Sequence, residues 1–234
     1  MIPPVEGLVV GSVDLGDADR ILRVLTPLEG RVSVVVRRAR SRSGAATAPG
    51  TSVRIAIARA RDGLRVARAV EAISSPVRAR DTLGRIALLA YGCELCGALA
   101  PEVAPAPRLH GLLGAWLQRL EGQDEPGACC RLALEAKALT FAGLAPALLR
   151  CAACGEVLDD PAVFDAEAGG GLHARCGGGL RVPAGALQAL DALLRTPLAE
   201  IAEGPPPSPP FLLAGFAEHH LGRGLQSRAL LAVS

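Results

Sequence analysis

Aromatic residues and lysine are both scarce in this sequence. Phe, Trp and Tyr make up 3% of the 234 residues, and residues 1–80 contain none of them. Small barrels that bind single-stranded nucleic acid usually stack bases on aromatic rings, so any such binding by this part of the chain must use other contacts. Of the 25 basic residues, 24 are arginine and one is Lys137. Contacts with phosphate would therefore rest on arginine, and they would be sensitive to salt.

Long apolar runs are also absent. The runs 86–90 and 230–233 are far shorter than the roughly 20 residues that cross a bilayer, so we predict no membrane helix. The N-terminus lacks a basic leader and carries Glu6 inside its first apolar run, which does not fit a signal peptide. We expect a cytoplasmic protein. Its seven cysteines would be reduced, which favours metal binding over disulfides.

Several catalytic motifs are missing as well. The sequence has no phosphate-binding G-x-x-x-x-G-K-[ST] loop, no strand-borne G-x-G-x-x-G and no G-x-S-x-G. His219 and His220 lie near the end of a predicted helix, where surface positions are the simpler interpretation. We therefore do not expect an enzyme.

Charge is unevenly distributed along the chain. The formal net charge is +2, but residues 1–80 hold 14 arginines against seven acidic residues, and the remainder carries −5. A basic first part suggests a polyanionic partner bound there. The alternative is that some of these arginines are simply solvated.

The first 75 residues have the periodicity of strands. Larger apolar residues alternate with Arg or Ala in 53–59, as in a sheet with one buried face. Further strands are predicted at 8–13, 21–25, 32–36 and 64–73, with Asp62-Gly63 as a hairpin turn. Five short strands joined by turns predict a small closed barrel.

After Pro76 the pattern changes to that of helices. Helices are predicted at 82–100, 109–120, 127–141, 184–195 and 211 to about 220, with a stiff proline-rich spacer at 204–210. Trp116 and Tyr91 lie on apolar helix faces and are expected in the core. The same holds for the pairs Cys93/Cys96 and Cys129/Cys130, since buried cysteine behaves as a small apolar residue.

Two ligand pairs dominate residues 151–176. Cys151 and Cys154 form one C-x2-C pair, and His173 and Cys176, with the same gap, follow after 18 intervening residues. A two-residue gap lets a tight turn direct two side chains at one zinc ion. Four protein ligands leave no position for a reactive water, so we expect structural rather than catalytic zinc. The alternative is a set of free thiols on loops.

The most basic point of the chain is the segment 37–44. It follows a predicted strand and contains Arg37, Arg38, Arg40 and Arg42. Arginines on such a loop would contact phosphates without regard to base sequence. A basic loop can also be merely solvated.

Three stretches together resemble the RecO family of bacterial recombination mediators. GLVVGSVDLGDADRILRVLTPLEGRVSVVVRRARSRSG is similar to the family's first barrel strands and basic loop. RLALEAKALTFAGLAPALLRCAACG resembles its helix leading into the first ligand pair, and FAEHHLGRGLQSRALL resembles its C-terminal signature. The chain departs from the usual pattern in having His173 at a position commonly occupied by cysteine, and in using Arg in place of mixed Lys and Arg.

The resemblance implies an α+β multidomain protein with an N-terminal OB-fold β-barrel and an α-helical domain carrying an inserted zinc finger. The domains would be 1–78 and 79–234, with the insertion at about 150–180. Members bind single- and double-stranded DNA, anneal complementary strands and help to load RecA onto DNA coated with single-strand-binding protein. The implied partners are RecR and the C-terminal tail of single-strand-binding protein, near the nucleoid.

The predicted sites follow from these observations. Structural zinc is assigned to Cys151, Cys154, His173 and Cys176. DNA contacts are assigned to Arg37, Arg38, Arg40, Arg42, Arg54, Arg65 and Arg68. A zinc-containing OB-fold protein that binds RNA or the ribosome, or a transcription factor, is the main alternative, and a zinc hydrolase or deaminase is the third.

Overall fold

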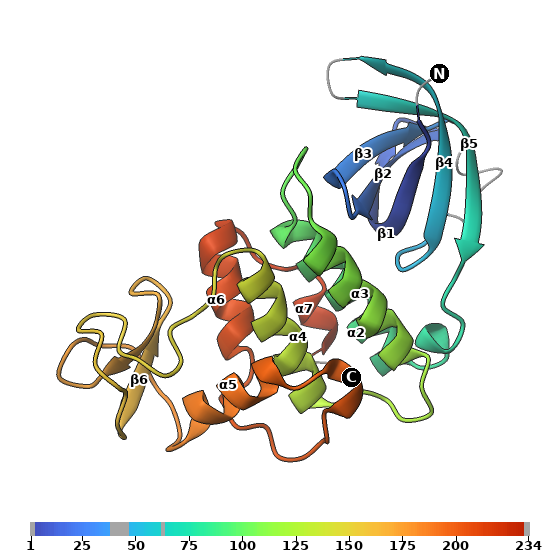
Figure 1. Cartoon of the computed structure of the whole chain (residues 1–234). Helices are drawn as coiled ribbons and strands as arrows, with labels where there is room; N and C mark the ends of the chain where they lie inside the picture. Colours follow the sequence, from blue (N-terminus) through green and yellow to red (C-terminus); the bar gives the residue numbers. More distant parts are fainter. Residues whose placement is uncertain (1–2, 38–46, 62–63, 232–234) are drawn as a thin grey trace. The chain divides into compact units, whose positions relative to one another are not determined.

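The structure, a computed structural model, describes residues 3–37, 47–61 and 64–231. The chain divides into two compact units (Figure 1), which are described separately below. The barrel unit contains residues 1–123 and 227–234, and the ribbon unit contains residues 124–226. The chain therefore passes from one unit to the other twice. The boundary at residue 78 stays a prediction, since these units divide at other positions.

The barrel unit begins with five strands, as predicted. They close into a barrel in the order β1-β2-β3-β5-β4, with β1 paired to β4. The β3–β5 pair is parallel and the others are antiparallel. The OB-like barrel expected from the sequence is confirmed. The strands are β1 (Val5–Leu15), β2 (Asp19–Thr26), β3 (Gly30–Val36), β4 (Ser52–Arg61) and β5 (Leu64–Ser74).

Alternation along the strands builds an aliphatic barrel core. Leu22 and Val24 of β2 pack with Val32, Val34 and Val36 of β3, and every second residue contributes. Because successive side chains of a strand point to opposite faces, this alternation assigns the intervening residues to the outside. The core cluster contains no aromatic residue, so compact β-branched side chains fill it.

The β2–β3 turn is held by its own side chains and by the loop after α2 (Leu83–Leu99). The Thr26 hydroxyl donates to the Gly30 carbonyl (3.1 Å) and accepts from the Glu29 N–H (3.0 Å). Gly30 has φ of +67°, and a Cβ there would lie 2.2 Å from the Pro101 carbonyl oxygen. Only glycine fits such a position, which lets the turn approach the loop closely.

Helices cover one part of the barrel's outer face. α2 and α3 (Pro107–Leu120) both contact β1 and β2, and η1 (Arg78–Arg80) precedes them. The Thr82 hydroxyl accepts from the Arg85 N–H (3.1 Å), which caps α2. Gly97 lets α2 approach the sheet, since a Cβ there would lie 2.8 Å from the Val10 side chain. Arg31 of β3 donates to the Gly97 carbonyl (3.0 Å).

The cores of both units include the residues expected there. Trp116 and Tyr91 are fully buried, and the Trp116 indole N–H donates to the Leu88 carbonyl (3.1 Å). Cys93, Cys96, Cys129 and Cys130 are buried too, which confirms their interpretation as core residues. Burial raises the pKa of the Cys93 thiol to about 12.

The last segment of the chain returns to the barrel unit. α7 (Arg228–Leu231) packs against α2. The Glu94 carboxylate of α2 accepts from the Ser227 N–H (2.8 Å) and from the Ser227 hydroxyl (2.5 Å). These bonds attach residue 227, which begins the returning segment, to the middle of α2.

The ribbon unit has α4 (Ala128–Phe141) at its centre, with residues 129–139 buried. α5 (Ala186–Arg195), α6 (Leu212–Leu221) and η2 (Leu198–Glu200) contact it. The N–H groups of Gly127, Cys129 and Cys130 donate to the Glu203 carboxylate over 2.8–3.1 Å. This carboxylate caps α4 and anchors the start of the proline-rich segment, since the helix N-terminus favours negative charge.

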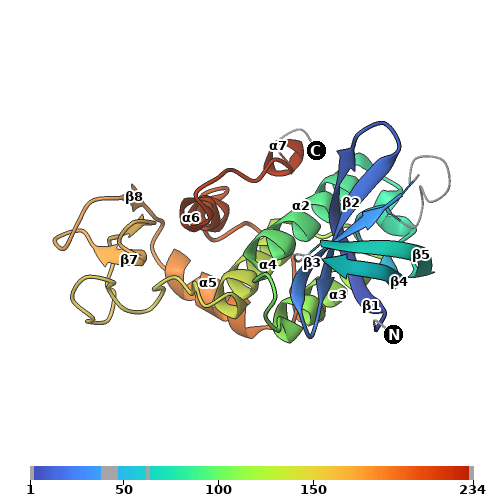
Figure 2. The same cartoon turned by 90° about the horizontal axis from the view of Figure 1, so that it is seen from above.

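Three short strands complete the ribbon unit. β6 (Ala162–Asp165) lies between β7 (Gly170–His173) and β8 (Leu180–Arg181), and β7 and β8 are labelled in Figure 2. Phe164 of β6 contacts Phe216 of α6 with ring centroids 5.6 Å apart. These strands were not predicted from the sequence, because they are short and lack an alternating pattern.

Candidate metal centre and nucleic-acid interface

The four predicted metal ligands come together. The Sγ atoms of Cys151, Cys154 and Cys176 and a ring nitrogen of His173 all lie within 4.8 Å of one another. Zinc takes such donors in a tetrahedron, with Zn–S near 2.3 Å and Zn–N near 2.0–2.1 Å. The cluster could therefore hold a metal ion, and the donor set is consistent with zinc.

Backbone hydrogen bonds form the two ligand turns. The Gly155 N–H donates to the Cys151 carbonyl (2.9 Å), and the Cys151 N–H donates to the Glu156 carbonyl (2.8 Å). Gly155 has φ of +77°, as the tight turn requires. In the second turn, the Cys176 N–H donates to the His173 carbonyl (2.9 Å). Each turn thus directs two ligands towards the same point.

The surroundings of His173 fix the orientation of its ring. Its Nδ1 lies 3.4 Å from the Cys154 Sγ and 3.8 Å from the Cys176 Sγ. Its Nε2 lies 2.9 Å from the Val157 carbonyl oxygen and 3.3 Å from an Asp159 carboxylate oxygen. Nε2 therefore carries the hydrogen and donates it, which leaves the Nδ1 lone pair for a metal. Acceptors behind a ligating histidine are common at metal sites.

The thiols influence one another's protonation. Burial raises the pKa of Cys151, but the N–H groups of Cys154, His173 and Ala153 outweigh it and lower the pKa to about 6. Burial and the neighbouring Cys154 and Cys151 raise the pKa of Cys176 to about 11. Three thiolates would repel one another at this distance, and a bound cation would compensate their charge.

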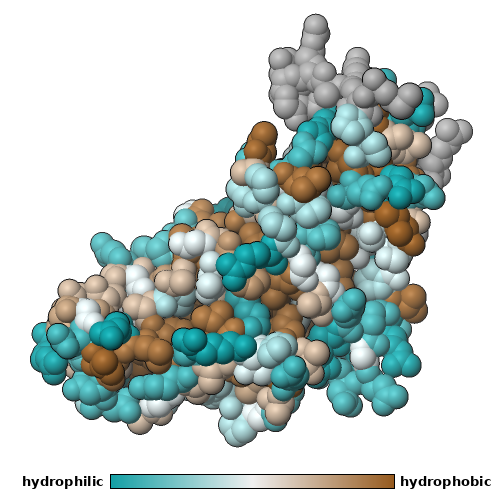
Figure 3. Space-filling view, viewed as in Figure 1, coloured by the Kyte–Doolittle hydropathy of each residue, from teal (hydrophilic) through white to brown (hydrophobic). Residues whose placement is uncertain are grey.

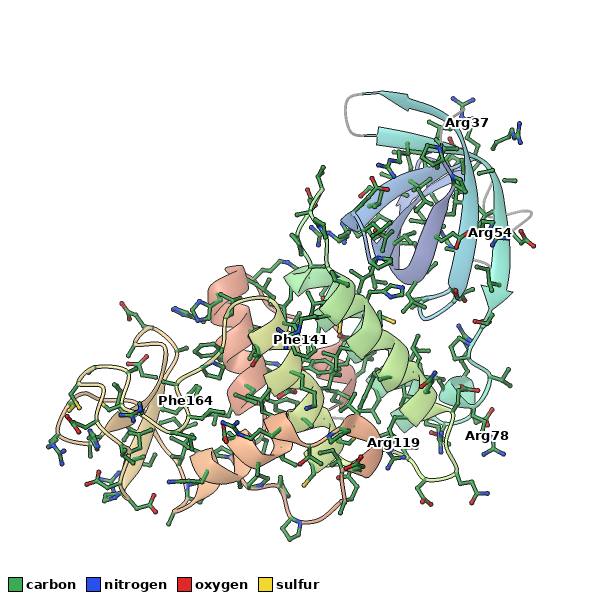
Figure 4. All side chains as sticks on the ribbon, viewed as in Figure 1. Arg37, Arg54, Arg78, Arg119, Phe141 and Phe164 are labelled. Atoms are coloured by element: carbon green, nitrogen blue, oxygen red, sulfur yellow. The ribbon has the colours of Figure 1, made fainter. Side chains whose placement is uncertain are left out.

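The predicted DNA-binding arginines of the barrel differ in their exposure and in their ion pairing. Arg37 is exposed and directly follows β3, and Figure 4 labels it at the end of the barrel away from α2 and α3. Arg68 of β5 is exposed as well. Neither makes an ion pair with a carboxylate in the part of the chain that the structure describes. Arg38, Arg40 and Arg42 lie outside the described residues.

Arg54 and Arg65 are engaged by carboxylates. The Arg54 Nε donates to Glu6 of β1 (2.6 Å), and Arg54 lies opposite Glu71 of β5. The hydrogen bond to Glu6 is the main reason why the pKa of Arg54 is raised. Arg65 donates to both Glu29 carboxylate oxygens, and this contact lowers the pKa of Glu29. Because a carboxylate already neutralises each of these arginines, both are weaker candidates for phosphate binding than the sequence suggested.

The exposed arginines of the barrel unit that were not singled out from the sequence include Arg23 and Arg78. Arg23 lies on β2, opposite Gly11 and Ser33, and Arg78 lies in η1 and is labelled in Figure 4. Arg23 has no carboxylate partner among the described residues, whereas the positive charge of Arg78 interacts with the Glu121 carboxylate. A single arginine within an alternating strand carries no distinctive pattern, so only the strand register could have identified Arg23.

A cavity of about 460 Å³ lies between the barrel and α3. Its lining includes Ser52, Ser75, His110 and Glu121. The Glu121 carboxylate accepts from the Ala79 N–H (2.9 Å), and Arg80 donates to the Ser75 hydroxyl (3.1 Å). Burial lowers the pKa of His110. These polar contacts attach η1 to the end of α3 and to the segment after β5, which gives them a structural role.

Comparison with known proteins agrees with both halves of this description. The family model "Recombination protein O N terminal" matches residues 1–76, and "Recombination protein O C terminal" matches residues 80–229. The chain belongs to the RecO family. The resemblance noted in the sequence is therefore confirmed, and the RecO assignment supports a role in DNA repair consistent with a recombination mediator.

Curated relatives match over most of their length. DNA repair protein RecO of Anaeromyxobacter sp. (strain K) is 38% identical over 240 residues, covering 96% of this chain and 94% of that protein. The RecO protein of Myxococcus xanthus (strain DK1622) is 33% identical over 237 residues, covering 97% and 96%. The RecO protein of Pelotomaculum thermopropionicum is 32% identical over 203 residues, covering 84% and 78%.

The helices of the described residues do not meet the requirements of a bilayer. None of them combines the length and the apolar character that a membrane-spanning segment needs.

Proposed function

We propose that the chain is a recombination mediator without a catalytic centre of its own. It binds single- and double-stranded DNA, anneals complementary strands and helps to load RecA onto DNA coated with single-strand-binding protein. The observation that carries this proposal is the OB-like barrel with exposed arginines that have no carboxylate partner among the described residues, in a chain of the RecO family.

Arginine charge is the physical basis of annealing in this proposal. Complementary strands repel each other through their phosphates, and each arginine bound to a phosphate releases a condensed counterion. Arg37 and Arg68 supply this charge on the described barrel, and Arg38, Arg40 and Arg42 follow Arg37 in the sequence. Contacts of Arg54 and Arg65 with DNA remain predictions, since Glu6 and Glu29 compete for them.

Zinc at the four-ligand cluster has a structural role in this proposal. Cys151, Cys154, His173 and Cys176 would hold the ion, and all four tetrahedral positions would then be filled by protein. Bound zinc would cross-link the turn at 151–155 to the end of β7. No step of annealing depends on it.

The partners follow from the family. RecR and the C-terminal tail of single-strand-binding protein are the proposed protein partners, and the proposed location is the cytoplasm near the nucleoid. Both assignments rest on the resemblance of the chain to RecO proteins, and neither defines a surface.

The decisive experiment is annealing of complementary oligonucleotides coated with single-strand-binding protein, with and without a zinc chelator. We expect acceleration by the protein, falling with increasing salt. After chelation, DNA binding by the barrel should remain while the ribbon unit loses stability. A preference for structured RNA over single-stranded DNA in direct competition would contradict the proposal and favour an RNA-binding role.

A further inference from the structure

The strand register aligns four β-branched residues across four neighbouring strands. Val13 of β1 lies opposite Ile21 of β2. Ile21 lies opposite Val35 of β3, which in turn lies opposite Val66 of β5. Directly opposed residues share a face of the sheet, so these four form one continuous row. We call them the aliphatic row.

The aliphatic row lies on the outer face of the barrel. Leu22 and Val34, which follow Ile21 and precede Val35 in the chain, belong to the barrel core. Neighbours along a strand point to opposite faces, so the row points outwards. Val13 is 45% exposed, Ile21 and Val66 are partly exposed, and Val35 in the middle is buried. The outer face of a sheet commonly carries polar residues, which makes an aliphatic row here unexpected.

The helices of the barrel unit cover a different part of this face. Leu25 of β2 is fully buried, and Val10 lies against Gly97 of α2. Between this covered part and the aliphatic row lies a row formed by Gly11, Arg23 and Ser33. The aliphatic row is thus separated from the helix-covered region by a small and polar row. Figure 3 shows hydrophobic residues among hydrophilic ones on the visible side of the barrel.

Arginines border the aliphatic row on both sides. Arg23 lies in the row next to it, opposite two small residues. Arg37 and Arg68 lie two residues beyond Val35 and Val66, on the same face, and both are exposed. Within the described ranges none of the three forms an ion pair with a carboxylate, although Asp19 precedes Arg20, which lies opposite Val36, the residue before Arg37. By contrast, Arg20, Arg31, Arg54 and Arg65 all form ion pairs.

We propose that the aliphatic row contacts the bases of single-stranded DNA, while Arg23, Arg37 and Arg68 bind the phosphates on either side. This proposal rests on the DNA-binding function proposed above and defines how the same barrel distinguishes single strands from duplex. A single strand can turn its bases towards an apolar surface, whereas a duplex keeps them stacked and offers mainly phosphates. Residues 1–80 contain no aromatic ring, so aliphatic side chains take the place of stacking rings.

Charge decides between DNA and other occupants of the row. A neutral apolar protein surface would satisfy the aliphatic side chains but would leave the three arginines without an anionic partner. Single-stranded DNA satisfies both, because its bases and its phosphates lie side by side along the strand. A second copy of this chain is the other occupant that the experiment must separate.

The test compares the affinity for an oligothymidylate with that for a duplex of mixed sequence. The double variant Val13→Thr/Ile21→Thr keeps β-branched side chains but replaces apolar groups with hydroxyls. We expect its affinity for the single strand to fall about five- to tenfold, with duplex affinity unchanged within about twofold. The salt dependence should be unchanged, because every arginine that binds phosphate is still present.

Two further variants complete the comparison. Ile73→Thr/Val77→Thr makes matched changes at residues that are 52% and 71% exposed elsewhere on the barrel unit, and it should bind both DNAs normally. Arg23→Gln should weaken both, and it should reduce the slope of log affinity against log salt by about 0.7 for the single strand and about 0.9 for the duplex. Melting temperatures establish that each variant is folded.

A measurement on the unchanged protein covers the case in which the double variant does not fold. With isoleucine methyl groups labelled for NMR, the oligothymidylate should shift the Ile21 signal and leave the Ile73 signal in place. Equal single-strand and duplex losses in the Val13/Ile21 variant, or an unshifted Ile21 signal, would overturn the proposal. So would normal DNA binding with lost self-association in that variant, which would make the row an interface between copies. If the unchanged protein bound neither DNA, the proposed function itself would fail.

Discussion

The barrel and the three-stranded sheet of the ribbon unit are both small, but they are stabilised in different ways. The barrel closes its five strands around nine buried aliphatic residues. The strands β6, β7 and β8 have four, four and two residues, too few to bury a comparable core. Three cysteines and a histidine gather beside them instead. A bound metal commonly replaces a hydrophobic core at this size, so loss of metal should damage the ribbon unit and spare the barrel.

The two sheets also differ in charge. The barrel carries arginines on its outer face, whereas the loops around the metal ligands are acidic. Arg175 lies 3.8 Å from Asp159, and this ion pair neutralises part of the small positive charge of the region. DNA binding and metal binding are therefore assigned to separate surfaces. The acidic residues of these loops are Glu156, Asp159, Asp160, Asp165 and Glu167.

The largest effect is expected from removing two metal ligands. Cys151→Ser/Cys154→Ser should abolish zinc binding and unfold the ribbon around residues 147–181, because structural zinc contributes on the order of 10 kcal/mol to small folds. Zinc content by elemental analysis and hydrogen exchange along the chain would measure both effects. The substitution Cys93→Ser/Cys96→Ser, at cysteines outside the cluster, should leave zinc content unchanged. Selective loss of DNA binding by a folded Cys151/Cys154 variant would contradict the assignment of DNA binding and metal binding to separate surfaces.

The next largest effect concerns the basic segment after β3. Arg37, Arg38, Arg40 and Arg42 changed together to Ala should reduce DNA affinity about 100-fold at low salt. The salt dependence on single strands should flatten by up to about 0.7 for each arginine that binds a phosphate. The reduction should be similar for all base sequences. Fluorescence anisotropy over a series of salt concentrations measures it. Unchanged affinity and slope would remove these residues from the interface.

A smaller effect is expected from the acceptor behind His173. Asp159→Asn removes the charge 3.3 Å from Nε2 and should weaken zinc binding about tenfold. Glu156→Gln removes a charge from the same region and serves as the matched control. Competition with a chromophoric chelator gives both affinities. Equal affinities of the two variants would show that the carboxylate does not orient the ring.

The smallest effect separates paired from unpaired arginines. Arg68→Gln should lower duplex affinity about two- to threefold and reduce the salt slope by about 0.9, since its charge has no described carboxylate partner. Arg54→Gln should change neither, because Glu6 already accepts from that side chain. Parallel salt titrations of the two variants provide the measurement. If Arg54→Gln weakened binding as much as Arg68→Gln, ion pairing would not distinguish the two.

Regular patterns in the sequence predicted most of the fold and the whole metal cluster. The five barrel strands, the five main helices and the four ligands depend on spacing along the chain, which a single sequence contains. Ion pairing does not: Arg54 meets Glu6 and Arg65 meets Glu29 only after distant strands have been aligned. The aliphatic row was not predicted either, because its four members come from four strands that are aligned only in the fold. The short strands β6, β7 and β8 form through their partners rather than through a pattern of their own.

The return of residues 227–231 to α2 has a consequence for the order of events during synthesis. The ribosome completes residues 124–226 before it makes Ser227, whose N–H and hydroxyl both bind Glu94. At about 5–20 residues per second, synthesis of residues 124–226 takes about 5–20 s, and throughout this time the barrel unit lacks its last element. The unit that begins first is therefore the last to be finished.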